Sequence, residues 1–412
     1  MYDIKNNRLI TVTSILLSGS ILISSCSVGK KHKRFEDGYE MPSDIPAQYS
    51  VYDDGLVPDV ELQTGGTCWA NAACTVMENG YRKYGHRAVE MDAVALAVMV
   101  YNPHSAEGYM IADRSDIYEA GGTTEMVVDT AVNGFGSYVL VDSCDLTDHS
   151  EEDIKRGVMA FGGVTVGLNE NEDNYLYTAD TCSMIASDND PINHQAVIVG
   201  WDDSFSKDEF IRPASRDGAW LVQNSYSAQW GDDGFYWVSY DTPITDLHTM
   251  VMSIGYSSVA SYDRGYTSLL QYGTDIRVAN AFTKTGRIGA VGTFTTAPGQ
   301  HIVVEIMDSD RRTVLDSYEA TFEIEGYHTI ELDEPLTADS DGVFIAVTYS
   351  GYAPMEGPSH ITNGIQYNAS ISAGQSYVYS NGSWLDLSED STLDVIGLSE
   401  ACNNACIKAL YL

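Results

Sequence analysis

Gly65-Gly66-Thr67-Cys68-Trp69-Ala70 opens the first strong helical pattern of this chain. Apolar residues recur at helical spacing beyond it, which predicts a helix from Cys68 to about Tyr84. The glycines predict a turn that leads directly into this helix and puts Cys68 in its first turn. A helix N-terminus favours a thiolate over a thiol, so the position suits a nucleophile. On this stretch alone, a small buried cysteine at a helix start is an equally ordinary interpretation.

Two later blocks carry side chains that can activate a thiol. His194 stands at the start of a predicted strand, two residues before the apolar run 196–199, and Asn224 follows the apolar run 219–222. An imidazole can accept the proton of a thiol, and an amide oxygen can hold that imidazole in place. A histidine at a strand edge or an asparagine in a turn is ordinary by itself. The three residues together, in the order Cys, His, Asn, predict a catalytic set.

This set resembles the papain family of cysteine peptidases. Cys68 precedes Trp69, and the separation of 126 residues between positions 68 and 194 is close to the ~130–150 that is typical of the family. The resemblance implies an α+β, two-lobed papain-like fold over residues 46–255, with a helical lobe facing a β-rich lobe. It implies Cys68 as nucleophile, His194 as its base and Asn224 as the residue that orients that base.

The sequence departs from the family pattern close to the nucleophile. Papain relatives usually carry a glutamine six residues before the cysteine, which helps to form the oxyanion hole. Here that position is Leu62, and Gln63 stands one residue later, so a shortened turn would give Gln63 the role; otherwise Gln63 is an exposed turn residue. Tyr226 replaces a common tryptophan, and Gly65 replaces a cysteine that forms a disulfide in relatives.

The N-terminal segment 1–26 is predicted to be a bacterial lipoprotein signal. Two basic residues precede an apolar run too short to span a bilayer, and the run ends in Ile23-Ser24-Ser25-Cys26. Cys26 would carry the lipid, residues 27–45 would form a tether, and the rest of the chain would face outward from the cell membrane. The alternative is an ordinary secretory peptide with an incidental cysteine. About twenty residues between Cys26 and the predicted domain leave no room for a long inhibitory propeptide.

The C-terminal part, residues 256–412, is predicted to be an all-β sandwich. Short strands alternate with Gly, Asp, Asn and Pro turns, and the stretches 280–283, 289–298 and 373–377 resemble a lectin-like domain that follows the peptidase in some prokaryotic surface proteins. "Lectin-like" describes a shape and does not establish sugar binding, so cell-surface carbohydrate is a possible partner.

Composition excludes several classes of function. Acidic residues outnumber basic ones 59 to 22, and a net charge of -37 argues against nucleic acid and against electrostatic docking on anionic lipid. Membrane contact is therefore expected only through the lipid anchor. The nine histidines form no HExxH or paired Cys/His pattern, and no phosphate-binding or dinucleotide fingerprint occurs, so we expect no metal and no cofactor.

The spacing of Cys144 with Cys182 and of Cys402 with Cys406 leaves disulfides possible.

The sequence thus predicts a cysteine-type endopeptidase acting on proteins or peptides outside the cytoplasm. Leu62 in the expected glutamine register and the missing propeptide motivate one alternative, a surface adhesin whose papain-like lobes have lost turnover. A second alternative is a transpeptidase, which would need an acceptor amine that competes with water.

Overall fold

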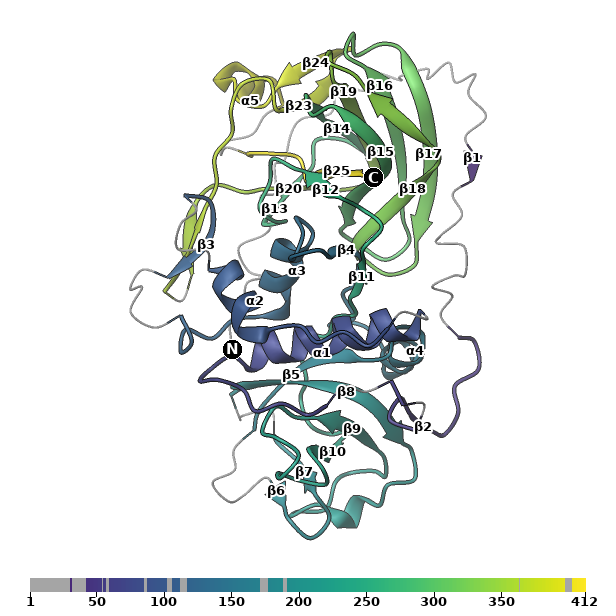
Figure 1. Cartoon of the computed structure of the whole chain (residues 1–412), viewed down its shortest axis with the longest axis vertical. Helices are drawn as coiled ribbons and strands as arrows, with labels where there is room; N and C mark the ends of the chain where they lie inside the picture. Colours follow the sequence, from purple (N-terminus) through teal and green to yellow (C-terminus); the bar gives the residue numbers. More distant parts are fainter. Residues whose placement is uncertain are drawn as a thin grey trace.

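The computed structural model describes residues 30–31, 42–53, 55–56, 59–84, 87–101, 106–111, 117–170, 177–187, 191–362, 364–396 and 402–412. Figure 1 shows a β-rich part at the top, a smaller sheet at the bottom, and the long helix α1 lying across the middle. The predicted signal segment with Cys26 lies outside the described residues, as does most of the predicted tether.

The helices of the described residues begin with the one predicted from Cys68 to about Tyr84, which is confirmed. They are α1 (Cys68–Lys83), α2 (Ala93–Val100), α3 (Thr124–Ala131) and α4 (Glu151–Phe161), and a short α5 (Asp390–Ile396) interrupts the β-rich part. Helix α2 begins at Ala93 because the side chain of Asp92 accepts a hydrogen bond from the backbone N–H of Ala95 and caps the helix.

The lower sheet carries the β-rich lobe. Its strand order is β2-β8-β9-β10-β7-β6, and β5 pairs with β8 outside this path. All neighbours are antiparallel except β10 and β7. The strands are β2 (Gln48–Ser50), β5 (Val164–Leu168), β6 (Tyr177–Thr178), β7 (Ser183–Met184), β8 (His194–Asp202), β9 (Ala219–Gln223) and β10 (Phe235–Ser239).

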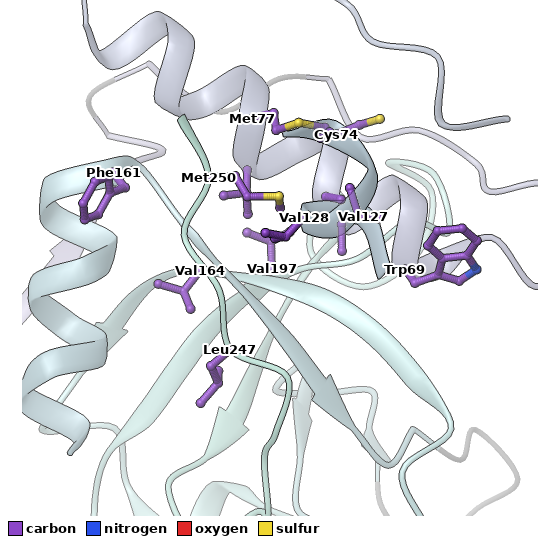
Figure 2. Packing of buried hydrophobic residues seen from close by; sticks show 14 of the residues in the cluster. Trp69, Cys74, Met77, Val127, Val128, Phe161, Val164, Val197, Leu247 and Met250 are labelled. Atoms are coloured by element: carbon purple, nitrogen blue, oxygen red, sulfur yellow. The ribbon is translucent and has the colours of Figure 1, made fainter. Parts of the chain in front are cut away.

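Helix α1 is held between this sheet and the upper part of the molecule by apolar packing. Figure 2 shows Met77 of α1 near Val127 of α3, Val197 of β8 and Met250, and all four side chains are buried in one cluster. Such close packing fixes the helix axis against β8. The start of α1 is therefore fixed in position relative to the start of β8.

The upper part is a sandwich of two larger sheets around its own apolar core, with two small sheets at its base. One large sheet has the order β1-β17-β16-β19-β14-β23-β24 and the other β11-β4-β18-β15-β25-β12. The strands of the first are β1 (Lys30–Lys31), β14 (Asp275–Phe282), β16 (Gln300–Asp308), β17 (Val314–Phe322), β19 (Val343–Ser350), β23 (Ser376–Ser380) and β24 (Ser383–Asp386). Those of the second are β4 (Val139–Cys144), β11 (Val251–Ser253), β12 (Ser258–Ala260), β15 (Gly286–Thr295), β18 (Gly326–Ala338) and β25 (Ile407–Tyr411). The small sheets contain β13 (Ser268–Leu270) with β20 (Ala353–Met355), and β21 (His360–Thr362), β22 (Ile365–Asn368) and β3 (Gly108–Ile111).

Two strands from the first half of the chain belong to the upper part. Strand β4 pairs with β18, with Cys144 opposite Gly326 and Asp142 opposite His328, and β3 pairs with β22. The sequence analysis did not predict either strand. The two parts of the chain are therefore joined by main-chain hydrogen bonds as well as by the covalent link near residue 255.

The disulfides that spacing left possible are not formed. Cys182, Cys402 and Cys406 are all free thiols, so neither Cys144–Cys182 nor Cys402–Cys406 is bridged. Among the helices that the structure describes, none is long and apolar enough to cross a bilayer.

Candidate active site

The turn before α1 fixes the position of Cys68. Gly65 has a φ of +59°, a conformation that side chains disfavour, and the backbone N–H of Gly66 donates to the carbonyl oxygen of Tyr118 at 2.7 Å. A Cβ on Gly65 would lie 2.5 Å from Oε1 of Glu119. The two glycines thus allow a close approach of the chains, and Cys68 becomes the first residue of α1, as predicted.

Strand pairing brings His194 and Asn224 together. His194 is the first residue of β8, and Asn224 follows β9, the strand that pairs with β8 so that Val197 faces Gln223. Oδ1 of Asn224 lies 2.8 Å from Nε2 of His194, and both side chains are buried. The structure thus brings the Asn224 side-chain oxygen against the His194 imidazole.

Cys68 completes the set because α1 packs against β8. Burial raises the pKa of the Cys68 thiol, but a hydrogen bond and the charge of His194, with backbone N–H donors of Gln195 and Trp69, outweigh burial and leave that pKa lowered. Burial would lower the pKa of His194, yet the charge of Glu170 and the contact with Cys68 raise it to about 10. The geometry therefore favours a thiolate beside an imidazolium.

The amide of Asn224 has every polar atom engaged. Its Oδ1 also accepts the backbone N–H of Ser225 at 2.8 Å, and its Nδ2 donates to Oε1 of Glu170 at 2.8 Å. These contacts define which end of the amide faces His194.

Gln63, and not Leu62, faces the site. The Leu62 side chain is 71% exposed, whereas Gln63 is half-buried and accepts a hydrogen bond on Oε1 from Oγ of Ser225 at 2.7 Å. Its Nε2 donates to the carbonyl oxygen of Gly65 at 2.6 Å. The structure thus places the glutamine amide next to the loop that carries Asn224, one residue away from the usual family register.

Aromatic rings cover the imidazole. The ring centroid of Tyr226 lies 5.1 Å from that of His194, and Trp230 makes edge contacts with both Tyr226 and Tyr236. The Tyr226 hydroxyl lies 3.5 Å from Nδ1 of His194. These rings reduce the access of water to the imidazole and increase the strength of the polar contacts around it.

An acidic cavity of about 280 Å³ lies beside this set, with Asn224 and Ser225 in its lining. Glu61, Glu78 and Glu90 also line it. Burial raises the pKa of Glu78 to about 7, with a smaller lowering contribution from the backbone N–H of Met91.

Glu170 is the functional candidate that the sequence analysis missed. It stands in the stretch Asn169-Glu170-Asn171-Glu172-Asp173, in a chain with 59 acidic residues, so a single carboxylate there does not stand out. Had the apolar run 164–168 been identified as a strand beside β8, a polar residue just beyond its end would have been a candidate neighbour of His194.

Two sequence families match consecutive parts of the chain. The family described as "Papain family cysteine protease" matches residues 45–254, and the "Lectin like domain" matches residues 260–411.

Two curated plant proteins are similar to about half of the chain. Pro-cathepsin H of Medicago truncatula is 23% identical over 212 residues, covering 47% of this chain and 56% of the relative. The oryzain gamma chain of Oryza sativa subsp. japonica is 24% identical over 212 residues, covering 47% of this chain and 54% of that protein, so the chain spans about half the length of these curated relatives.

The crystal structure of the cysteine protease and lectin-like domains of Cwp84, a surface layer associated protein of Clostridium difficile, superposes with a TM-score of 0.73. It is 20% identical in sequence and covers 90% of each chain, which confirms the papain-like fold followed by a lectin-like β domain. With its first half matched by that family and its fold shared with a solved protease, this chain belongs to the papain family of cysteine proteases.

Proposed function

We propose that the chain is a cysteine-type endopeptidase that hydrolyses peptide bonds of proteins or peptides outside the cytoplasm. One observation carries the proposal: the buried imidazole of His194 contacts the Cys68 thiol and also lies 2.8 Å from Oδ1 of Asn224. A nucleophile, a base and a residue that orients the base are the three parts that acyl transfer needs.

The chemical steps follow from these positions. The Cys68 thiolate attacks the carbonyl carbon of the scissile peptide, and the imidazolium of His194 gives its proton to the leaving amine. The acyl group is then bound to sulfur as a thioester. His194, now neutral, takes a proton from water, the hydroxide attacks the thioester, and the thiolate and imidazolium are regenerated.

The oxyanion of each tetrahedral intermediate needs hydrogen-bond donors. We assign this role to the backbone N–H of Cys68 and to Nε2 of Gln63, which has a second N–H besides the one given to Gly65. The hydrogen bond from Ser225 Oγ to Oε1 of Gln63 supports this assignment, because it directs the amide nitrogen away from the Asn224 loop.

We also propose a preference for cationic peptides. The net charge of -37 and the acidic cavity beside Asn224 attract basic side chains at low ionic strength. Lys/Arg-rich peptides should be cleaved faster than matched neutral peptides in low salt, and the advantage should shrink as salt screens the charges. Equal rates in low salt contradict this preference.

Active-site labelling tests the peptidase proposal. The purified full-length chain is treated with iodoacetamide or an epoxide probe near pH 6, and mass spectrometry locates the label. We expect rapid labelling at Cys68 that disappears in Cys68→Ala and slows strongly in His194→Ala. Cys182 is partly exposed and serves as an internal reference thiol. A casein or peptide-library digest then defines specificity.

If Cys68 reacts no faster than Cys182 in the folded chain, the peptidase proposal has no chemical basis. A binding protein built on the papain fold, such as a surface adhesin, is then the better interpretation. If labelling is rapid but water-dependent cleavage is absent while an added amine is acylated, the chain is a transpeptidase.

For carbohydrate binding we propose the outer face of the first large sheet. Tyr379 of β23 and Trp384 of β24 have ring centroids 5.1 Å apart, and the guanidinium of Arg277 lies 5.0 Å from the Trp384 ring. Arg277 also donates to Glu305 at 2.5 Å. Aromatic faces beside fixed polar groups are suited to stack on sugars. A glycan that binds the full-length chain but not Trp384→Ala supports the proposal; equal binding by both contradicts it.

For location we propose attachment to the outer side of the cell membrane through a lipid on Cys26. The motif Ile23-Ser24-Ser25-Cys26 after an apolar run supports this. Fractionation of cells that express the full chain should find it in the membrane, and Cys26→Ser should release it. An unchanged distribution of the variant overturns the lipid anchor.

A further inference from the structure

The position of Glu170 beside His194 is fixed by the backbone. Leu168, at the end of β5, pairs with His194, and Glu170 follows two residues later. The backbone N–H of Glu170 donates to Oδ1 of Asn193 at 2.8 Å, and Nδ2 of Asn193 donates back to the carbonyl oxygen of Glu170 at 2.9 Å. Asn193 is the residue directly before His194. This reciprocal pair holds Glu170 at the site.

The Glu170 carboxylate is directed at the catalytic imidazole. Its Oε2 lies 3.0 Å from Nε2 of His194, and the side chains of His194 and Glu170 are 5% and 3% exposed. Apart from this contact with His194, Oε2 has no hydrogen-bond donor among the described residues, so His194 supplies the compensation that the structure records for this oxygen. A buried carboxylate without a compensating charge is costly, which favours a positive charge on His194.

The same carboxylate fixes the amide of Asn224. An ionised carboxylate can only accept hydrogen bonds, and Oε1 of Glu170 accepts from Nδ2 of Asn224 at 2.8 Å. If the amide were flipped, its NH₂ group would face the N–H groups of His194 and Ser225, and its oxygen would face a negative charge. Glu170 therefore selects the orientation in which Oδ1 receives the proton of Nε2.

We propose that Glu170 is a fourth, positioning member of the active site, which keeps His194 protonated and holds Asn224 in its working orientation. The proposal rests on the proposed peptidase function and deepens it. A papain-type Cys–His pair needs the imidazolium form to donate a proton to the leaving amine. A carboxylate in contact with the imidazole stabilises that form to a higher pH than an asparagine alone.

The charged and titratable groups around His194 act in two directions. Cys68 as a thiolate and Glu170 as a carboxylate both favour the imidazolium. Tyr226 places its hydroxyl near Nδ1 of His194. The pKa of Tyr236 is raised first by burial and then by the charge of Glu170. Burial opposes the charge on His194, so loss of the Glu170 charge should lower the pKa of His194.

The pH dependence of turnover separates a positioning role from a merely structural one. In the thiolate–imidazolium form, the acidic limb of kcat/KM reports the formation of the Cys68 thiolate and the alkaline limb reports loss of the His194 proton. In Glu170→Gln, which keeps an oxygen for Asn224 but removes the charge, we expect the alkaline limb to fall by about 1–3 pH units. The acidic limb should move little.

The control is Glu209→Gln, which removes one exposed carboxylate of the same lobe and should leave both limbs in place. Glu170→Asp retains the charge and should keep most of the alkaline range. An equal loss of activity by Glu170→Gln at every pH, with the alkaline limb unmoved, overturns the proposal in favour of a structural role. If the pH profile of kcat/KM in Glu170→Gln is the same as in wild type, both roles proposed for Glu170 are wrong.

A second measurement tests, without any catalytic turnover, whether Glu170 stabilises the protonated form of His194. In the full-length Cys68→Ala chain, the imidazole of His194 is titrated by NMR with and without Glu170→Gln. We expect titration above the ordinary pKa of about 6.5 when Glu170 is present, and at least about one unit lower when it is replaced. If the wild-type chain cleaves no peptide but this shift occurs, the peptidase function fails and the Glu170 proposal stands. If the wild type cleaves and the shift is absent, only the Glu170 proposal fails.

Discussion

Gln63 and Ser225 are joined by two hydrogen bonds: Oγ of Ser225 donates to Oε1 of Gln63 at 2.7 Å, and the backbone N–H of Gln63 donates to the carbonyl oxygen of Ser225 at 2.8 Å. Ser225 follows Asn224 directly. The proposed oxyanion donor is thus tied to the same loop as the residue that orients the base.

Removal of the Gln63 amide should lower kcat. We expect Gln63→Ala to reduce kcat by about 10²–10³-fold with a smaller change in KM, because the donor acts mainly on the charge of the transition state. Ser225→Ala leaves the amide in place and should have a weaker effect. Leu62→Ala, at the exposed neighbouring position, is the control for the turn itself. A Gln63→Ala enzyme with normal kcat shows that other donors form the hole.

The turn glycine Gly65 should tolerate no side chain. Gly65→Ala puts a Cβ 2.5 Å from Oε1 of Glu119 and 3.0 Å from the carbonyl oxygen of Tyr118, so the turn must shift and displace Cys68. We expect the alkylation rate of Cys68 to fall at least tenfold. Gly55→Ala has a similar positive φ and nothing within 4 Å, so it carries the backbone strain without the crowding. Equal rates in the two variants exclude the crowding argument.

A buried ion pair in the sandwich should be sensitive to removal of one partner. Lys408 and Asp263 are both fully buried and in direct contact. Lys408→Met leaves the Asp263 carboxylate without its cation and should reduce the free energy of unfolding by about 3–5 kcal/mol. In the double variant Lys408→Met/Asp263→Leu, most of the loss should be recovered. Denaturant unfolding of the full chain measures both, and an equally unstable double variant contradicts the assignment.

Glu356 should make the stability of the chain depend on pH. Burial, and next the charge of Asp263, raise the pKa of this carboxyl to about 8 in the folded protein. The folded state therefore holds the proton more tightly than the unfolded state, so the stabilisation is present at acidic pH and is lost as pH rises from about 4.5 towards 8. Tm should fall over that range, and Glu356→Gln should flatten the fall. The control is Glu323→Gln, which removes an exposed carboxylate and should leave the curve of Tm against pH as in wild type. If Glu356→Gln also leaves that curve unchanged, Glu356 is not the responsible group.

The sequence predicted the parts of the fold that local pattern determines. Helical periodicity placed α1, and the apolar runs beside His194 and Asn224 placed β8 and β9. The grouping of Cys68, His194 and Asn224 was predicted from their order, their local context and the resemblance to the papain family.

What the sequence could not predict depends on partners far away along the chain. The short apolar sequence of β4 is compatible with a strand or with a buried helix segment. Its pairing with β18 makes it part of the upper sheet. Glu170 became a candidate only when β5 was seen beside β8. The orientation of Gln63 likewise depends on Ser225, 162 residues later. Local pattern carries no signal for such contacts.

The pairing of β4 with β18 has a consequence for the order of events during synthesis. Residues 139–144 leave the ribosome long before residues 326–328, which supply their hydrogen-bonding partners. Until then, one edge of β4 has no strand to pair with, and long-range pairing of this kind forms slowly. The upper sheet that contains β4 can therefore be completed only after β18, well inside the lectin-like domain, has been made.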